Sequence, residues 1–101
     1  MRQTGRPEGA QVFYYSSSEE SKRLAEHIQA EIVSFVQMSN HRKPKADGSY
    51  YILKQTAIPA VIVECGFLSN PEDRRNLVNP EYQEKIAWAI YLGILKYFGV
   101  S

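Results

Sequence analysis

Residues 60–70 read Ala60-Val-Ile-Val-Glu-Cys-Gly-Phe-Leu-Ser-Asn70, and this stretch decides the fold. Its first four residues are apolar without alternation, which indicates a strand covered on both faces in the middle of a parallel sheet. Pro59 introduces this strand, and Gly66 allows the backbone to turn after it. The pattern therefore predicts a central strand that ends at Glu64.

Glu64 is the first candidate functional residue, because it follows the apolar run directly. The carboxyl ends of parallel strands are where α/β proteins hold their ligands. A carboxylate beside a buried strand loses hydration unless a partner compensates it. Glu64 is thus expected to face a partner charge, a metal-bound water or a substrate. The alternative is a structural glutamate that caps a helix or pairs with Lys or Arg.

A strand and a long helix are expected before this stretch. Residues 11–15 are β-branched and aromatic, which is typical of a strand. Ser16, Ser17 and Ser18 each offer an N-cap, and Ser16 and Ser17 stand three residues before a glutamate, the spacing of a capping box at a helix start. Apolar residues then recur at intervals of three and four through residues 24–36. Residues 1–9, with two glycines and a proline, are expected to form a flexible leading segment.

The remainder of the chain continues the alternation of strands and helices. Residues 39–49 are polar with turn signals, and residues 50–53 are expected to form a second strand. Asn70-Pro71 and Asn79-Pro80 each place an N-cap residue before a proline at the first helical position, which predicts two further helices. This order predicts an α/β fold, with a mostly parallel sheet and flanking helices, across residues 10–101.

Composition narrows the classes of function. The chain has 101 residues, of which 44% are hydrophobic and 23% charged, as in one soluble globular domain. Twelve basic and eleven acidic residues give a net charge of +1, which favours neither nucleic acid nor an anionic membrane as partner. The longest apolar run, residues 86–95, is too short to span a bilayer. No apolar segment after Met1 resembles a signal peptide.

Several motifs together resemble one enzyme family. The stretch Pro59-Ala-Val-Ile-Val-Glu-Cys-Gly-Phe-Leu-Ser-Asn70 and the helix starting at Pro80 resemble the C-terminal half of the zinc-dependent N-acetylmuramoyl-L-alanine amidases, most closely the spore-cortex type. The strand over residues 9–15 and the helix segment over residues 20–25 match as well. The resemblance therefore covers residues 9–97, as part of an amidase catalytic domain.

This resemblance implies an activity, a cofactor and a place of action. It implies hydrolysis of the amide that joins the lactyl group of N-acetylmuramic acid to L-alanine in peptidoglycan. It implies a zinc ion held by His, Glu and His, and location in the cell envelope or outside the cytoplasm. Glu64 matches the glutamate of the family motif. Its implied role is to accept a proton from the zinc-bound water and pass it to the leaving amine.

The family's zinc ligands have no counterpart in this chain. They lie upstream of the strand that Gln11 begins, where this sequence reads Arg2-Gln-Thr-Gly-Arg-Pro-Glu8 without histidine. The two histidines, His27 and His41, are fourteen residues apart and lack metal-ligand spacing. We therefore expect a fragment of the domain that neither binds zinc in the family manner nor hydrolyses peptidoglycan alone.

Arg42 is the candidate substrate-binding residue. It lies in the cationic loop Asn40-His-Arg-Lys-Pro-Lys45, which could meet a carboxylate-bearing peptide stem or an acidic partner. The alternative is a loop that is simply solvated.

Two other functions remain open. Cys65 could be the nucleophile of a cysteine hydrolase with His27 or His41 as base, although Val63 stands where a nucleophile elbow has glycine. A buried, inert thiol is the simpler interpretation. The chain could also be a non-catalytic interaction module that self-associates through an uncovered sheet edge.

Overall fold

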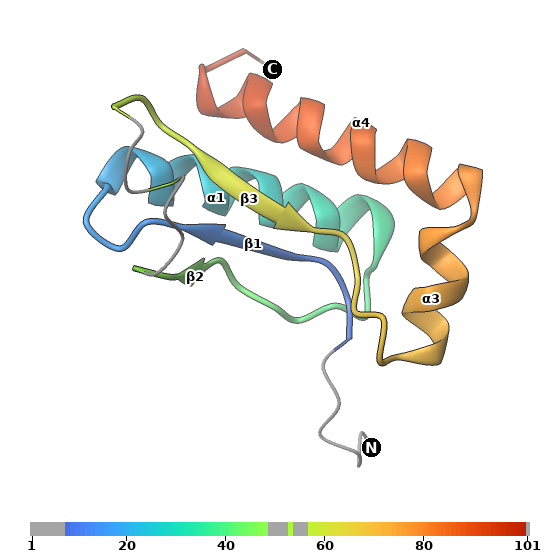
Figure 1. Cartoon of the computed structure of the whole chain (residues 1–101). Coiled ribbons are helices and arrows are strands. Elements are labelled where there is room, and N and C mark those ends of the chain that lie inside the picture. The colour runs from blue at the N-terminus through green and yellow to red at the C-terminus, as the bar shows by residue number, and fades with distance from the viewer. Residues whose placement is uncertain (1–7, 49–52, 54–56, 101) are drawn as a thin grey trace.

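The computed structural model describes residues 8–48, 53 and 57–100. Along the chain its main elements are β1 (Gln11–Tyr14), α1 (Glu19–Glu31), β2 (Lys45–Ala46), β3 (Val61–Glu64), α3 (Pro71–Leu77) and α4 (Pro80–Tyr97). The three strands form one sheet in the order β2-β1-β3. Helix α1 lies behind this sheet with α4 alongside it, and none of the labelled helices covers the face toward the viewer (Figure 1). The predicted α/β class with flanking helices is confirmed.

The sheet is mixed, whereas the sequence predicted mostly parallel pairing. Strand β1 is parallel to β2 but antiparallel to β3. Tyr14 at the end of β1 pairs with both Ala46 of β2 and Val61 of β3. Strand β3 thus begins at the end of the sheet where β2 finishes. It runs back along β1, so no crossover is needed to reach it.

Strand β1, and not β3, is the middle strand. All four residues of β1 are buried, whereas all four residues of β3 are only half-buried. Among the described residues no strand pairs with the outer edge of β3. The prediction of a central strand over residues 60–63 is therefore wrong for this part of the chain. An unbroken apolar run shows that a strand touches a core, but it does not show which strands flank it.

Helix α1 starts at the last of the three predicted N-cap serines and ends in a wider turn. Its N-cap is Ser18, whose hydroxyl accepts the Ser21 N–H at 3.1 Å. After α1 the chain forms one turn of π-helix over Ile32–Val36. Because this turn holds an extra residue, it shifts the apolar face, and Phe35 is 49% exposed.

Helices α3 and α4 begin as the sequence predicted. The Asn70 side chain accepts the Asp73 N–H at 3.0 Å, and the Asn79 side chain accepts the Glu81 N–H at 2.9 Å. Helix α4 packs most extensively against α1 and buries one side into the core. The residues of α4 buried there are Tyr82, Ile86, Ala89 and Gly93.

The segment between β1 and β3 departs from prediction. Leu53 is helical and buried, so the strand predicted over residues 50–53 is wrong at this residue. Residues 50–52 lie outside the described part, as do residues 1–7 of the predicted leading segment. The short strand β2 forms at Lys45–Ala46, inside the predicted polar loop.

Candidate active site

Glu64 is the last residue of β3 and pairs with Gln11, the first residue of β1. Side chains alternate between the two faces of a strand. Val61 and Val63 pack against the core with α1 and α4, so Ile62 and Glu64 lie on the opposite face. This is the face that no labelled helix covers (Figure 1). The predicted strand end is confirmed, and it places a carboxylate at one end of a sheet face that no described helix covers.

Arg42 lies at the same end of the sheet. Its Nη1 donates to Gln11 Oε1 at 2.8 Å, and its Nε donates to the Glu8 carbonyl at 2.7 Å. Its guanidinium carbon lies 5.0 Å from the ring centroid of Phe67, three residues after Glu64. The structure therefore brings the two sequence-predicted site residues into one neighbourhood through Gln11 and Phe67. The role of Arg42 in binding substrate stays a prediction.

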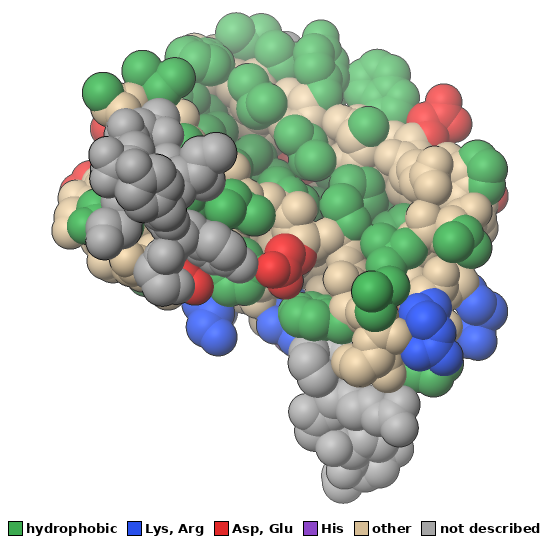
Figure 2. Space-filling view, viewed as in Figure 1, with side chains coloured by type: hydrophobic (Ala, Val, Ile, Leu, Met, Phe, Trp, Pro, Cys, Tyr) green, Lys and Arg blue, Asp and Glu red, His purple; other side chains and the backbone are tan. Residues whose placement is uncertain are grey.

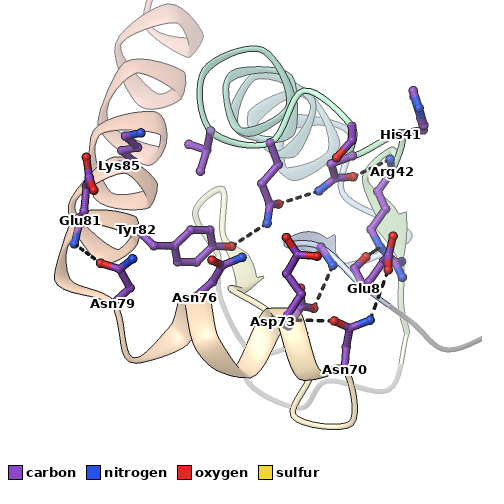
Figure 3. A pocket seen from close by; sticks show the side chains of 16 residues that line it. Glu8, His41, Arg42, Asn70, Asp73, Asn76, Asn79, Glu81, Tyr82 and Lys85 are labelled. Atoms are coloured by element: carbon purple, nitrogen blue, oxygen red, sulfur yellow. Dashed lines mark hydrogen bonds between the residues drawn. The ribbon is translucent and has the colours of Figure 1, made fainter.

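Arg42 also lines a polar cavity of about 620 Å³. The cavity lies between the start of β1, the chain that follows α1, and the first turns of α3 and α4. Figure 3 shows Arg42, Asp73 and Tyr82 around it, with Lys85 and Glu81 on α4. Its walls carry both charge signs and several side-chain amides, so they suit a polar ligand better than an apolar one.

Side-chain amides hold the start of β1 in place. Gln29, only 2% exposed, accepts the Val12 N–H at 2.8 Å and donates to the Ala10 carbonyl at 3.1 Å. Gln37 accepts the Ala10 N–H at 3.0 Å, and Asn40 donates to the Ala10 carbonyl at 3.0 Å. These groups replace strand pairing where β2 does not reach, and so fix the residues next to Gln11. A buried glutamine on a helix is a weak sequence signal, and these contacts were not predicted.

The described residues do not fit the zinc site that the resemblance implies. They contain no group of three or more His, Cys, Asp or Glu residues able to hold a metal ion. His27 lies on α1, and His41 lies in the loop before Arg42. Glu64 is therefore present at the site without a ligand set from the described residues.

The surroundings of Cys65 do not activate its thiol as a nucleophile. Burial raises the pKa of the Cys65 thiol, so the reactive thiolate is scarce near neutral pH. Its carbonyl accepts the Tyr82 hydroxyl at 2.7 Å, which ties the turn after β3 to α4. Burial raises the pKa of Tyr82 as well, with smaller effects from Cys65 and Asp73, so the phenol stays protonated as this donor. These observations favour the structural interpretation of Cys65.

Apolar side chains are spread over the face of the molecule that carries β3 and over the outer side of α4 (Figure 2). Five large apolar residues that are exposed lie on α4 or just beyond it: Trp88, Tyr91, Ile94, Phe98 and Val100. In the described ranges, no helix combines the length and apolar character needed to cross a bilayer.

Comparison with known proteins identifies the family. Residues 1–96 match the family described as N-acetylmuramoyl-L-alanine amidase. The chain belongs to this family. The germination-specific N-acetylmuramoyl-L-alanine amidase of Bacillus subtilis (strain 168) is 40% identical over 90 residues, which are 89% of this chain and 38% of that protein.

Solved amidase structures share the fold. The CwlD amidase of Clostridioides difficile, solved in complex with the GerS lipoprotein, has a TM-score of 0.91 and 44% identity, and the match covers 99% of this chain and 51% of that one. An N-acetylmuramoyl-L-alanine amidase of Clostridium difficile 630 has a TM-score of 0.83 and 28% identity, covering 98% and 53%. The amidase chain thus spans about half the length of these solved chains.

Proposed function

We propose that this chain forms part of a cell-wall amidase that cleaves the amide between the lactyl group of N-acetylmuramic acid and L-alanine, with Glu64 as its acid–base residue. The family match over residues 1–96 supports the reaction class. The observation that carries the proposal for Glu64 is its place at the end of β3, beside Gln11 and Arg42 and on the sheet face that no described helix covers.

In the proposed reaction, a water oxygen attacks the carbonyl carbon of the amide, and Glu64 accepts the proton that this water releases. The carbon–nitrogen bond then breaks, and Glu64 delivers the same proton to the leaving nitrogen. The products are the lactyl carboxylic acid, which then releases its proton to solvent, and the free amino group of L-alanine. One residue thus acts as base and then as acid, and it is regenerated at the end of the cycle.

We also propose that Arg42 holds a carboxylate of the peptide stem. Two of its nitrogens already bond within the described part of the chain, through Nε and Nη1, which fixes the plane of the guanidinium. Stacking over Phe67 restricts it further. Its Nη2 has no partner among the described residues and is left to meet a ligand oxygen.

Zinc is the cofactor that the family resemblance implies, and its chemistry would be activation of the attacking water. Because the described residues offer no ligand set, a bound zinc would have to be held chiefly by other residues. We therefore propose that this chain alone does not hydrolyse peptidoglycan.

A chimera tests the proposed function. This chain replaces the 90 residues that it matches in the germination-specific amidase of Bacillus subtilis, and release of amino groups from peptidoglycan is measured. We expect an active chimera that loses at least about a hundredfold in kcat on Glu64→Gln. Glu84→Gln is the matched control, since Glu84 is exposed on α4, does not line the polar cavity and should leave activity unchanged. Equal activity of the Glu64→Gln and unmodified chimeras would refute the role of Glu64.

The proposed partners are peptidoglycan and, through the outer edge of β3, a second copy of the chain. The unpaired edge in the described part supports self-association, because exposed strand edges recruit other strands. Light scattering of the purified chain is expected to give the mass of a dimer or larger species, and a single-chain mass would count against it. Cell-wall amidase relatives support action in the cell envelope.

A further inference from the structure

Asp73 makes two backbone contacts that a helix-start aspartate does not need. It lies in the first turn of α3 and is only 4% exposed. Its Oδ2 accepts the Gly9 N–H at 2.9 Å and the Phe67 N–H at 2.9 Å. These amides lie 64 and 6 residues away in the sequence. Figure 3 shows Asp73 reaching from α3 toward the start of β1.

Both bonded amides lie just beyond the Gln11–Glu64 pair, one on each of the two antiparallel strands. Gly9 is two residues before Gln11, and Phe67 is three residues after Glu64. Gln11↔Glu64 is also the last pair of the β1–β3 ladder. The carboxylate of Asp73 therefore joins the two strands just beyond the point where strand pairing ends.

The Asp73 side chain does not make the capping-box contact that its position in α3 allows. In a capping box, the third helical residue reaches back to the N-cap amide. Here the N-cap amide, Asn70 N–H, donates to the Phe67 carbonyl instead, and Asp73 turns to Phe67 and Gly9. A Cβ on Gly66 would lie 3.2 Å from Asp73 Cβ, so the absence of a side chain there lets the turn approach Asp73 closely.

We propose that Asp73 is a positioning residue that fixes Glu64 relative to β1 by joining the Gly9 and Phe67 amides. The link to hydrolysis rests on the proposed function, but the geometric claim does not. A carboxylate suits this task because it accepts several hydrogen bonds and donates none. Buried N–H groups without an acceptor are costly, so both amides depend on this side chain.

The test uses the 101-residue chain labelled with ¹⁵N. In Asp73→Ala, we expect amide exchange of Gly9 and Phe67 to speed up by about tenfold more than that of Val12 in mid-strand. We also expect cross-strand NOEs between Gln11 and Glu64 to weaken while those between Tyr14 and Val61 remain. Equal changes at both ends of the ladder would show a general loss of stability and would overturn the proposal.

Two further variants control this test. Asp73→Asn keeps an acceptor oxygen and should restore much of the protection, including in the case where Asp73→Ala fails to fold. Asn79→Ala removes the N-cap of α4 without touching Gly9 or Phe67, so it should leave their relative protection unchanged. In the chimera, Asp73→Ala should lower kcat with KM unchanged, and Asp73→Asn should restore much of that kcat. An inactive chimera with the expected NOE pattern would refute the proposed function alone.

Discussion

Gly93 sets the distance between α1 and α4, and a single added methyl group tests this contact. A Cβ at Gly93 would lie 2.6 Å from Ile28 Cα, 2.7 Å from Ile28 Cγ1 and 2.9 Å from Ile28 N. Two of these three atoms belong to the backbone of a buried helix, so a side-chain rotation cannot clear the space. The Gly93→Ala variant must therefore push the two helices apart.

The expected cost follows from two opposing effects. Overpacking a core costs roughly 1–3 kcal/mol, and a backbone clash places this site near the upper end. Replacing glycine by alanine inside a helix returns about 1 kcal/mol of helix propensity. The free energy of unfolding should fall by about 2 kcal/mol, which lowers Tm by about 8–16 °C in a domain of this size.

Urea unfolding followed by circular dichroism measures this change in the free energy of unfolding. The double variant Ile28→Ala with Gly93→Ala should remain less stable than Ile28→Ala alone, because the Ile28 Cα and N atoms stay in place. A Gly93→Ala variant that is as stable as the unmodified chain, or more stable, would refute the close approach of α1 and α4.

Three other predictions follow from single side chains. Tyr82→Phe removes a hydroxyl that donates to the Cys65 carbonyl at 2.7 Å and accepts from Gln37 at 3.0 Å. Thermal unfolding should show that the free energy of unfolding falls by about 1–2 kcal/mol, and an unchanged free energy would contradict these bonds. Burial raises the pKa of the Cys65 thiol, so iodoacetamide should modify the native chain at pH 7 far more slowly than the urea-unfolded chain. Equal rates of modification would contradict the inert, buried thiol. The hydrogen bond from the Tyr97 hydroxyl, followed by the interactions with Arg23, lowers the pKa of Glu20. The stabilisation that the ionised Glu20 gives the fold is therefore complete above the usual pKa of glutamate. It is lost as the pH falls through the lowered pKa of Glu20. In Tyr97→Phe, the NMR titration midpoint of Glu20 should rise toward its usual value, and an unchanged midpoint would count against the Tyr97 hydrogen bond.

Local signals in the sequence predicted local structure correctly. Asn70-Pro71 and Asn79-Pro80 start α3 and α4 because an N-cap and a proline act within a single turn. Glu64 was placed at a strand end because the apolar run stops there. In each case the residues that decide the structure are neighbours in the chain.

Long-range pairing could not be predicted in the same way. The direction of β3 and its place at the edge depend on where β2 ends, which no residue in β3 encodes. Asp73 was not singled out from the sequence, because nothing nearby in the sequence points to Gly9, 64 residues away. Arg42 was singled out for its charge, whereas its neighbours Gln11 and Phe67 became apparent only in the folded chain.

The buried amide of Gln29 has a consequence for how this sheet can grow. Because Gln29 occupies the hydrogen-bonding groups of Ala10 and Val12, that flank of β1 has no free backbone to offer another strand. The neighbouring β2 spans only two residues and is too short to template a long strand. Any long strand that enlarges the sheet, from this polypeptide or another, must therefore join along β3. Whatever completes the sheet will consequently also form a wall beside Glu64.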